Sequence, residues 1–122
     1  MTYQIRLIFF ISLSIVLYLS LVPSFEIPNF ASLSFYLDKL AHALIYFYLG
    51  YIGLFCRFGI SPLTVTLLIF GFGLMVEIIH YYHPYRFFEY LDLLANLIGV
   101  TIALLIFRLK SNLSYWFIIF SP

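Results

Sequence analysis

Residues 63–82 read LTVTLLIFGFGLMVEIIHYY, a long apolar stretch that contains one acid, Glu77, and one histidine, His80. A helix needs about 20 mostly apolar residues to cross the hydrocarbon core of a bilayer. The stretch meets this requirement and predicts a transmembrane helix. Because Glu77 lies about a turn and a half from its end, the helix also places an ionisable group within the membrane.

The composition extends this prediction to the whole chain. Of its 122 residues 65% are hydrophobic and 9% are charged, and the mean hydropathy is +1.10. A soluble domain has about 25% charged and about 45–50% apolar residues. Lipid is the solvent in which so many apolar side chains can face outward. The net charge of +1, with no basic run, gives no indication of nucleic-acid binding, and the single cysteine, Cys56, excludes an intrachain disulfide.

Three further apolar stretches predict three more spans. The first is not a signal peptide, because it is long and no small-residue cleavage site follows it. Short connections make consecutive helices antiparallel neighbours. We therefore predict a single domain over residues 1–122, an all-α integral membrane bundle of four transmembrane helices. The expected spans are residues 5–22, 38–56, 63–82 and 90–107.

The remaining segments are expected to lie outside the bilayer core. Residues 23–37 hold prolines and serines and predict a loop, and residues 57–62 and 83–89 predict turns. Residues 108–122 are too short to cross, and their Tyr115 and Trp116 favour the membrane–water interface, so we predict a short interfacial C-terminal tail.

The positions of the cations predict an orientation with both termini in the cytoplasm. Lys and Arg in short loops are enriched on the cytoplasmic side. In this N-in, C-in topology the inner cations are Arg6, Arg57, Arg108 and Lys110, and the outer ones are Lys39 and Arg86. All acids and histidines then fall in the outer loops or the outer half of a span: Glu26, Asp38, Glu77, Glu89, Asp92, His42, His80 and His83.

Each of the last three spans carries one polar stripe at helical spacing. The stripes are Asp38, His42, Tyr46 and Gly50; Gly73, Glu77 and His80; and Asp92, Asn96, Gly99 and Ala103. Each stripe has polar residues near the outer end of its helix and small residues deeper in the membrane. Small residues let helix backbones approach closely in lipid, so we expect a tight contact below an outward-facing polar pocket.

These residues fall into short motifs in a fixed order. They are DKLAH at residues 38–42, EIIH at 77–80, PYR at 84–86 and DLLANLIG at 92–99. Together they resemble the VanZ-like family of bacterial membrane proteins, whose pattern is roughly D-K-x-x-H, E-x-x-Q, P-x-R and D-x-x-x-N-x-x-G. The resemblance covers about residues 38–99 and the helix before them, within a motif-bearing core of 38–107. The chain departs from the pattern at His80, where the family usually has Gln.

The resemblance implies a multi-pass protein of the bacterial cytoplasmic (inner) membrane with a role in the cell envelope. The family is named for a protein linked to low-level resistance to the glycopeptide teicoplanin. The resemblance therefore implies envelope maintenance or glycopeptide tolerance, and it supplies no reaction.

Ionisable groups inside a membrane are functional candidates by default. The candidate acid–base residues are Asp38, His42, Glu77 and Asp92, with His42 or Glu77 as the general base. The candidate residues for binding a substrate are Lys39, Arg86, Asn96, Tyr46 and His80. Arg86 suits a carboxylate or phosphate through its planar, two-pronged donors, and with Lys39 would hold an anionic headgroup.

Each candidate also has a structural interpretation. Asp38 can cap a helix beside an interfacial cation, Lys39. His42 and Asn96 can make hydrogen bonds between helices, and Glu77 needs a partner, for which Arg86 and His42 are available. Tyr81, Tyr82, Tyr85 and Tyr90 fit an outer aromatic belt.

Three function classes follow from these interpretations. The chain is an enzyme acting on a lipid-linked or anionic envelope substrate, a protein that binds a headgroup or antibiotic without chemistry, or a bundle whose polar residues only fix helix packing. The G-x-S-x-G nucleophile signature is missing from the sequence.

The sequence does not predict a metal site. The pair Glu77 and His80 has the i, i+3 spacing of carboxylate-bridged bundles, but such sites use two pairs and the chain has one. It indicates no cofactor and no oligomeric state.

Overall fold

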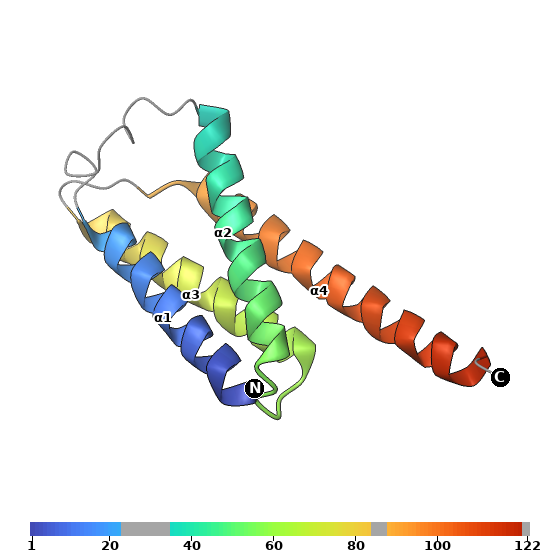
Figure 1. Ribbon diagram of the computed structural model, residues 1–122. Helices are drawn as coiled ribbons and strands as arrows, with labels where there is room; N and C mark the ends of the chain where they lie inside the picture. Colours follow the sequence, from blue (N-terminus) through green and yellow to red (C-terminus); the bar gives the residue numbers. More distant parts are fainter. Residues whose placement is uncertain (23–34, 84–87, 121–122) are drawn as a thin grey trace.

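The computed structural model describes residues 1–22, 35–83 and 88–120, and in them the chain folds into four helices and no strand (Figure 1). The helices are α1 (Thr2–Leu21), α2 (Phe35–Phe55), α3 (Pro62–Tyr82) and α4 (Tyr90–Phe120). The predicted all-α class and the predicted order of helices are confirmed.

Three of these helices are long and apolar enough to cross a membrane: Thr2–Leu21, Pro62–Tyr82 and the segment Tyr90–Ser114 of α4. Helix α2 is as long as α3, but its first two turns carry Asp38, Lys39 and His42. Apolar side chains cover the outside of the bundle; on α1 only Phe9 is buried. Such a surface suits lipid and not water.

Two helix boundaries differ from the predicted spans. Helix α2 begins at Phe35, so Asp38 lies in the first turn and is not the residue that caps the helix. Helix α4 continues through the predicted tail to Phe120, so no helix boundary separates residues 108–120 from the fourth span. Hydropathy falls after Phe107, but no glycine or proline interrupts the helix there.

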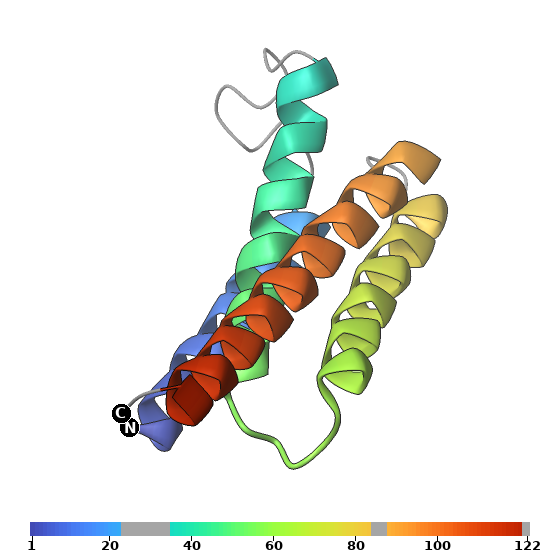
Figure 2. The same cartoon turned by 90° about the vertical axis from the view of Figure 1, so that its right-hand side faces the viewer.

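Helices α2 and α4 cross each other and form the most extensive contact of the bundle (Figures 1 and 2). Gly99 lies at this crossing. A Cβ added to it would overlap the carbonyl oxygen of Ala43 and lie 2.8 Å from the backbone nitrogen of Phe47. A Cβ on Gly50 would lie 3.1 Å from the Cβ of Ala103. The small residues of the two stripes therefore set the close approach of the helices.

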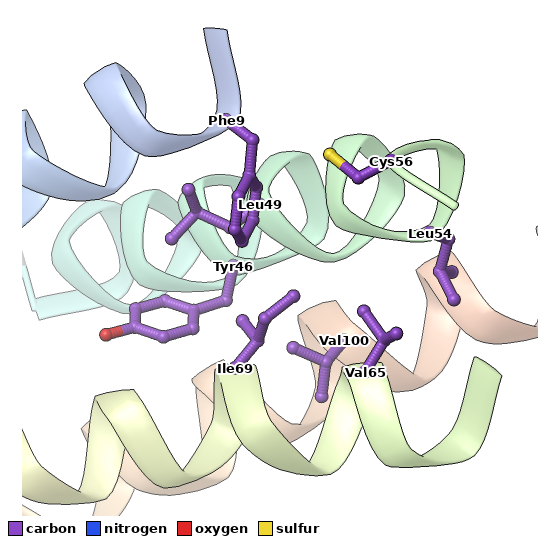
Figure 3. Close-up of a cluster of buried hydrophobic side chains, with 8 residues drawn as sticks. All are labelled: Phe9, Tyr46, Leu49, Leu54, Cys56, Val65, Ile69 and Val100. Atoms are coloured by element: carbon purple, nitrogen blue, oxygen red, sulfur yellow. The ribbon is translucent and has the colours of Figure 1, made fainter. Parts of the chain in front are cut away.

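Below the polar residues lies an apolar core (Figure 3). Leu49 of α2 has no exposed surface, and around it pack Phe9 of α1, Ile69 of α3 and Val100 of α4. Because every helix contributes, this core fixes α1 against α2 and α3 and joins α4 to them.

Arg6, Arg57 and Lys110 lie at the opposite end of the bundle from the described acids (Figure 1). The Arg6 guanidinium donates to the carbonyl oxygens of Cys56, at 2.9 Å, and Arg57, at 2.6 Å. Lys110 Nζ lies 5.6 Å from the centre of the Phe55 ring. The starts of α2 and α4 and the end of α3 lie away from this end (Figure 1). The predicted gathering of the acids and histidines at one end of the bundle is confirmed for the described residues.

Candidate functional site

Lys39 is the centre of a charged cluster between the starts of α2 and α4. Its ammonium group contacts three carboxylates: Asp38, at 3.0 Å, Glu89 and Asp92. The Lys39 side chain is 15% exposed and that of Asp92 is 8% exposed, whereas that of Glu89 is 45% exposed. The ion pair with Asp92 is therefore the buried one, and it joins the two helices directly.

His42 lies one turn after Asp38 and faces the same carboxylates. Its Nε2 is 3.6 Å from Asp92 Oδ2 and 3.9 Å from Asp38 Oδ1. Its Nδ1 lies 3.3 Å from Asn96 Oδ1. Because an amide oxygen can only accept, Nδ1 carries the hydrogen and donates it to Asn96. The neutral ring then presents an unprotonated Nε2 to the carboxylates.

The two aspartates are each shared between Lys39 and His42. One oxygen of each, Asp38 Oδ2 and Asp92 Oδ1, contacts the Lys39 ammonium. The other oxygen of each, Asp38 Oδ1 and Asp92 Oδ2, faces His42 Nε2. The acids are thus fixed in orientation by the cation on one side and face the imidazole on the other.

Asn96 connects the cluster to α3. It is 1% exposed, and a Cβ added to Gly73 would lie 2.8 Å from its Nδ2 and 2.9 Å from the Tyr46 ring. The absence of a side chain at Gly73 therefore makes room for Asn96 of α4 and Tyr46 of α2. The three predicted stripes do face each other, and they meet at Gly73, Asn96 and Tyr46.

Glu77 is held by the start of α4 and by its neighbour on α3. It is 1% exposed, and its Oε2 accepts a hydrogen bond of 3.3 Å from the backbone N–H of Glu89. Its Oε1 lies 3.5 Å from His80 Nδ1. Of its two predicted partners, His42 instead contacts the aspartates and Asn96, and Arg86 lies outside the described residues.

His80 joins α3 to the end of α1. Its Nε2 donates a hydrogen bond of 2.8 Å to the carbonyl oxygen of Ser20. The last four carbonyls of a helix have no partner within it, and Ser20 is one of these in α1. His80 therefore satisfies a helix end while its other nitrogen faces Glu77.

A glutamine amide, which the resembled family pattern has at this position, can also perform this role. We expect His80→Gln to change the free energy of unfolding little, because the Gln amide can donate to the same carbonyl. His80→Leu should lower it by about 1–3 kcal/mol, because the carbonyl and Glu77 both lose a partner. Unfolding by SDS in mixed micelles measures both variants, and equal losses would refute the role.

The structure brings most of the predicted site residues together. Five of them form the cluster: Asp38, Lys39, His42, Asp92 and Asn96. Tyr46, Glu77 and His80 lie around it, and Arg86 is outside the described residues. Glu89 was not predicted as a site residue; it immediately precedes α4, and its carbonyl oxygen accepts a hydrogen bond from the backbone N–H of Asp92.

An aromatic hollow lies near the end of α3. It has a volume of about 250 Å³ and is lined by Ile78, Tyr81, Tyr82, Phe88 and Tyr90.

 Another hollow, of about 370 Å³, lies between α1 and α3 and is lined by apolar side chains. The side chains of Tyr81, Tyr82 and Tyr90 are 70–80% exposed, as the predicted aromatic belt requires. The aromatic hollow offers an apolar surface at the same end of the bundle as the charged cluster.

The arrangement can support acid–base chemistry. His42 has one nitrogen oriented by Asn96 and the other facing two carboxylates, which is the arrangement of a general base held by a positioning group. The same contacts also join α2 to α4.

Comparison with known proteins identifies the family. Searches of the curated proteins and of the solved structures gave no match. The sequence profile of the VanZ/LLP1 family matches residues 2–111, which include α1, α2, α3, most of α4 and the whole cluster. The chain therefore belongs to the VanZ/LLP1 family.

Proposed function

We propose that this membrane protein uses the cluster around Lys39 and His42 to act on a lipid-linked or anionic envelope substrate at the outer leaflet. The role that fits is envelope maintenance or glycopeptide tolerance. One observation carries the proposal: a lysine, a histidine and three carboxylates converge at one end of a bundle of membrane-type helices. Ionisable groups are costly in such helices and usually mark a functional site.

The contacts suggest different roles for the members of the cluster. His42 is the general base, because Asn96 orients its ring and its Nε2 is unprotonated in the neutral form. Lys39 has three carboxylates around its ammonium, so its role is to position the acids and not to hold an anion by itself. Arg86 is then the cation assigned to an anionic headgroup.

A second candidate function is a bundle whose polar network only fixes the helices. Among the described residues, every buried side-chain nitrogen or oxygen has a hydrogen-bond partner. The contacts of Lys39 and His42 also cross from α2 to α4. A network that is fully satisfied can serve packing alone.

The variant His42→Gln separates the two candidates. We expect it to keep its level in the membrane, because an amide can still hydrogen-bond Asn96, and to lose any effect on teicoplanin susceptibility. Gly71→Ala is the control, because a Cβ at Gly71 meets nothing within 4 Å. If His42→Gln loses its membrane level and Gly71→Ala does not, the packing function gains support. If the wild-type gene never changes susceptibility, the tolerance role is wrong.

Mass spectrometry of lipids and cell-wall precursors distinguishes an enzyme from a binder. We expect a headgroup species that appears or disappears with the wild-type chain and not with His42→Gln. An inventory that does not change would assign binding without chemistry.

The proposal includes an orientation in the bacterial cytoplasmic membrane, multi-pass and with both termini inside. The two ends of α3 test it, because Ile60 and Tyr82 flank the helix and both are exposed. In a Cys56→Ala background, Tyr82→Cys should react with an impermeant maleimide added to intact cells, and Ile60→Cys should not. The reverse pattern would place the cluster in the cytoplasm.

A further inference from the structure

We propose that Asp38, His42 and Asp92 bind a divalent transition-metal ion. The ligand atoms would be Asp38 Oδ1, His42 Nε2 and Asp92 Oδ2. The inference deepens the proposed function and rests on it for the purpose of the ion, whereas binding itself can be measured without it. With the ion bound, His42 Nε2 would be a ligand, and a water on the ion would take the place of His42 as the general base.

The ligand atoms are close enough to share an ion. One ligand atom from each of the three residues lies within 4.8 Å of the others. His42 Nε2 is 3.6 Å from Asp92 Oδ2 and 3.9 Å from Asp38 Oδ1. Ligands at about 2.0–2.1 Å from a tetrahedral zinc are about 3.4 Å apart. His42 Nε2 is therefore within a few tenths of an ångström of this spacing from both aspartates, and the two aspartates lie within 4.8 Å of each other.

The same distances leave a gap that a proton does not fill. A charge-assisted N–H···O bond is about 2.7–2.9 Å long, so Nε2 is too far from either oxygen to donate one. Asn96 binds the hydrogen on Nδ1 and thereby directs the Nε2 lone pair toward the two carboxylates. With a neutral ring, three lone pairs converge on one position, and both carboxylates would attract a cation there.

Asn96 also fits the second shell of a metal site. A histidine that binds a metal through one nitrogen almost always donates the hydrogen of the other to an acceptor, which fixes the ring. Here the acceptor is the side-chain oxygen of Asn96, a residue of the facing helix that is only 1% exposed. Asn96 thus fixes the orientation of the His42 ring without help from the two aspartates.

Lys39 does not occupy the proposed position. It contacts Asp38 Oδ2 and Asp92 Oδ1, the oxygens that do not face His42. With a neutral His42, the described cluster has two more negative than positive charges, because three carboxylates surround one ammonium. A divalent ion would balance the cluster.

The ligand set indicates which ions fit. Imidazole suits Zn²⁺ and Fe²⁺, whereas sites for Mg²⁺ and Ca²⁺ are built from oxygen ligands alone. Catalytic zinc sites keep three protein ligands and one open position. The side chains of His42 and Asp38 are 27% and 31% exposed, which leaves a side open for water or a substrate oxygen.

Titration of the purified full chain with Zn²⁺ tests the proposal. After treatment with a chelator, we expect the wild-type chain in detergent to bind about one Zn²⁺ and to gain thermal stability, and to bind Mg²⁺ far more weakly. His42→Gln should lose this binding. Asn96→Ala should weaken it by about 10–100-fold, because it removes the group that orients the ring. His83→Gln is the matched control and should bind as the wild type does.

Wild-type protein that binds no Zn²⁺, or His42→Gln that binds as tightly as the wild type, would overturn the proposal. If the variants do not fold, Zn²⁺-dependent shifts of the His42 ring resonances in the wild-type chain provide the readout, and unchanged resonances count against the site. Zinc binding together with an unchanged lipid inventory would refute the proposed chemistry on the substrate and leave the metal site standing.

Discussion

Gly99→Ala should destabilise the bundle more than any other exchange of a glycine for alanine among the described helices. The new Cβ would meet backbone atoms of α2, the carbonyl of Ala43 and the nitrogen of Phe47, which cannot move aside as a side chain can. Overpacking costs about 1–3 kcal/mol and occasionally more. We expect a loss at the upper end of that range, because the two helices must separate along their most extensive contact.

Two other glycines provide a graded comparison for this result. Gly73→Ala should cost less, because the atoms that its Cβ meets belong to the side chains of Asn96 and Tyr46. Gly71→Ala should cost nothing measurable, because its Cβ meets nothing within 4 Å. Unfolding by SDS in mixed micelles would order the variants. Equal stability of Gly99→Ala and Gly71→Ala would refute the close contact of α2 and α4.

Lys39→Met should have the second large effect. Methionine retains an unbranched side chain of similar length and removes the charge. The carboxylate of Asp92, whose side chain is only 8% exposed, then has no cation beside it. Removing one partner of a buried ion pair costs about 3–5 kcal/mol. We expect a loss near the lower end, because Asp38 and Glu89 remain in contact with water. The same unfolding experiment measures it.

A pair of double-mutant cycles assigns this loss to particular carboxylates. The coupling of Lys39→Met with Asp92→Asn should exceed its coupling with Glu89→Gln, because the Glu89 side chain is 45% exposed and exposed pairs contribute about 0–1 kcal/mol. Equal couplings, or a Lys39→Met variant as stable as the wild type, would show that the buried pair does not join α2 to α4.

The sequence by itself determined the membrane character, the helices and the end at which polar residues collect. These properties follow from runs of apolar residues and from helical spacing, which are local. The stripes could also be predicted to face each other, because Gly99 and Ala103 are small at the positions where helices approach in lipid. Helix α4 continues past the predicted fourth span, residues 90–107, because hydropathy reports the depth in the membrane and not the end of a helix.

Only the tertiary structure decided which atoms of the site meet. Lys39 and Asp92 are 53 residues apart and His80 and Ser20 are 60 apart, so spacing along the chain cannot pair them. Nor can it show that each aspartate directs one oxygen to Lys39 and the other to His42. That division depends on the crossing of α2 and α4 at Gly99, because the crossing fixes the distance and the rotation of the two helices at the cluster.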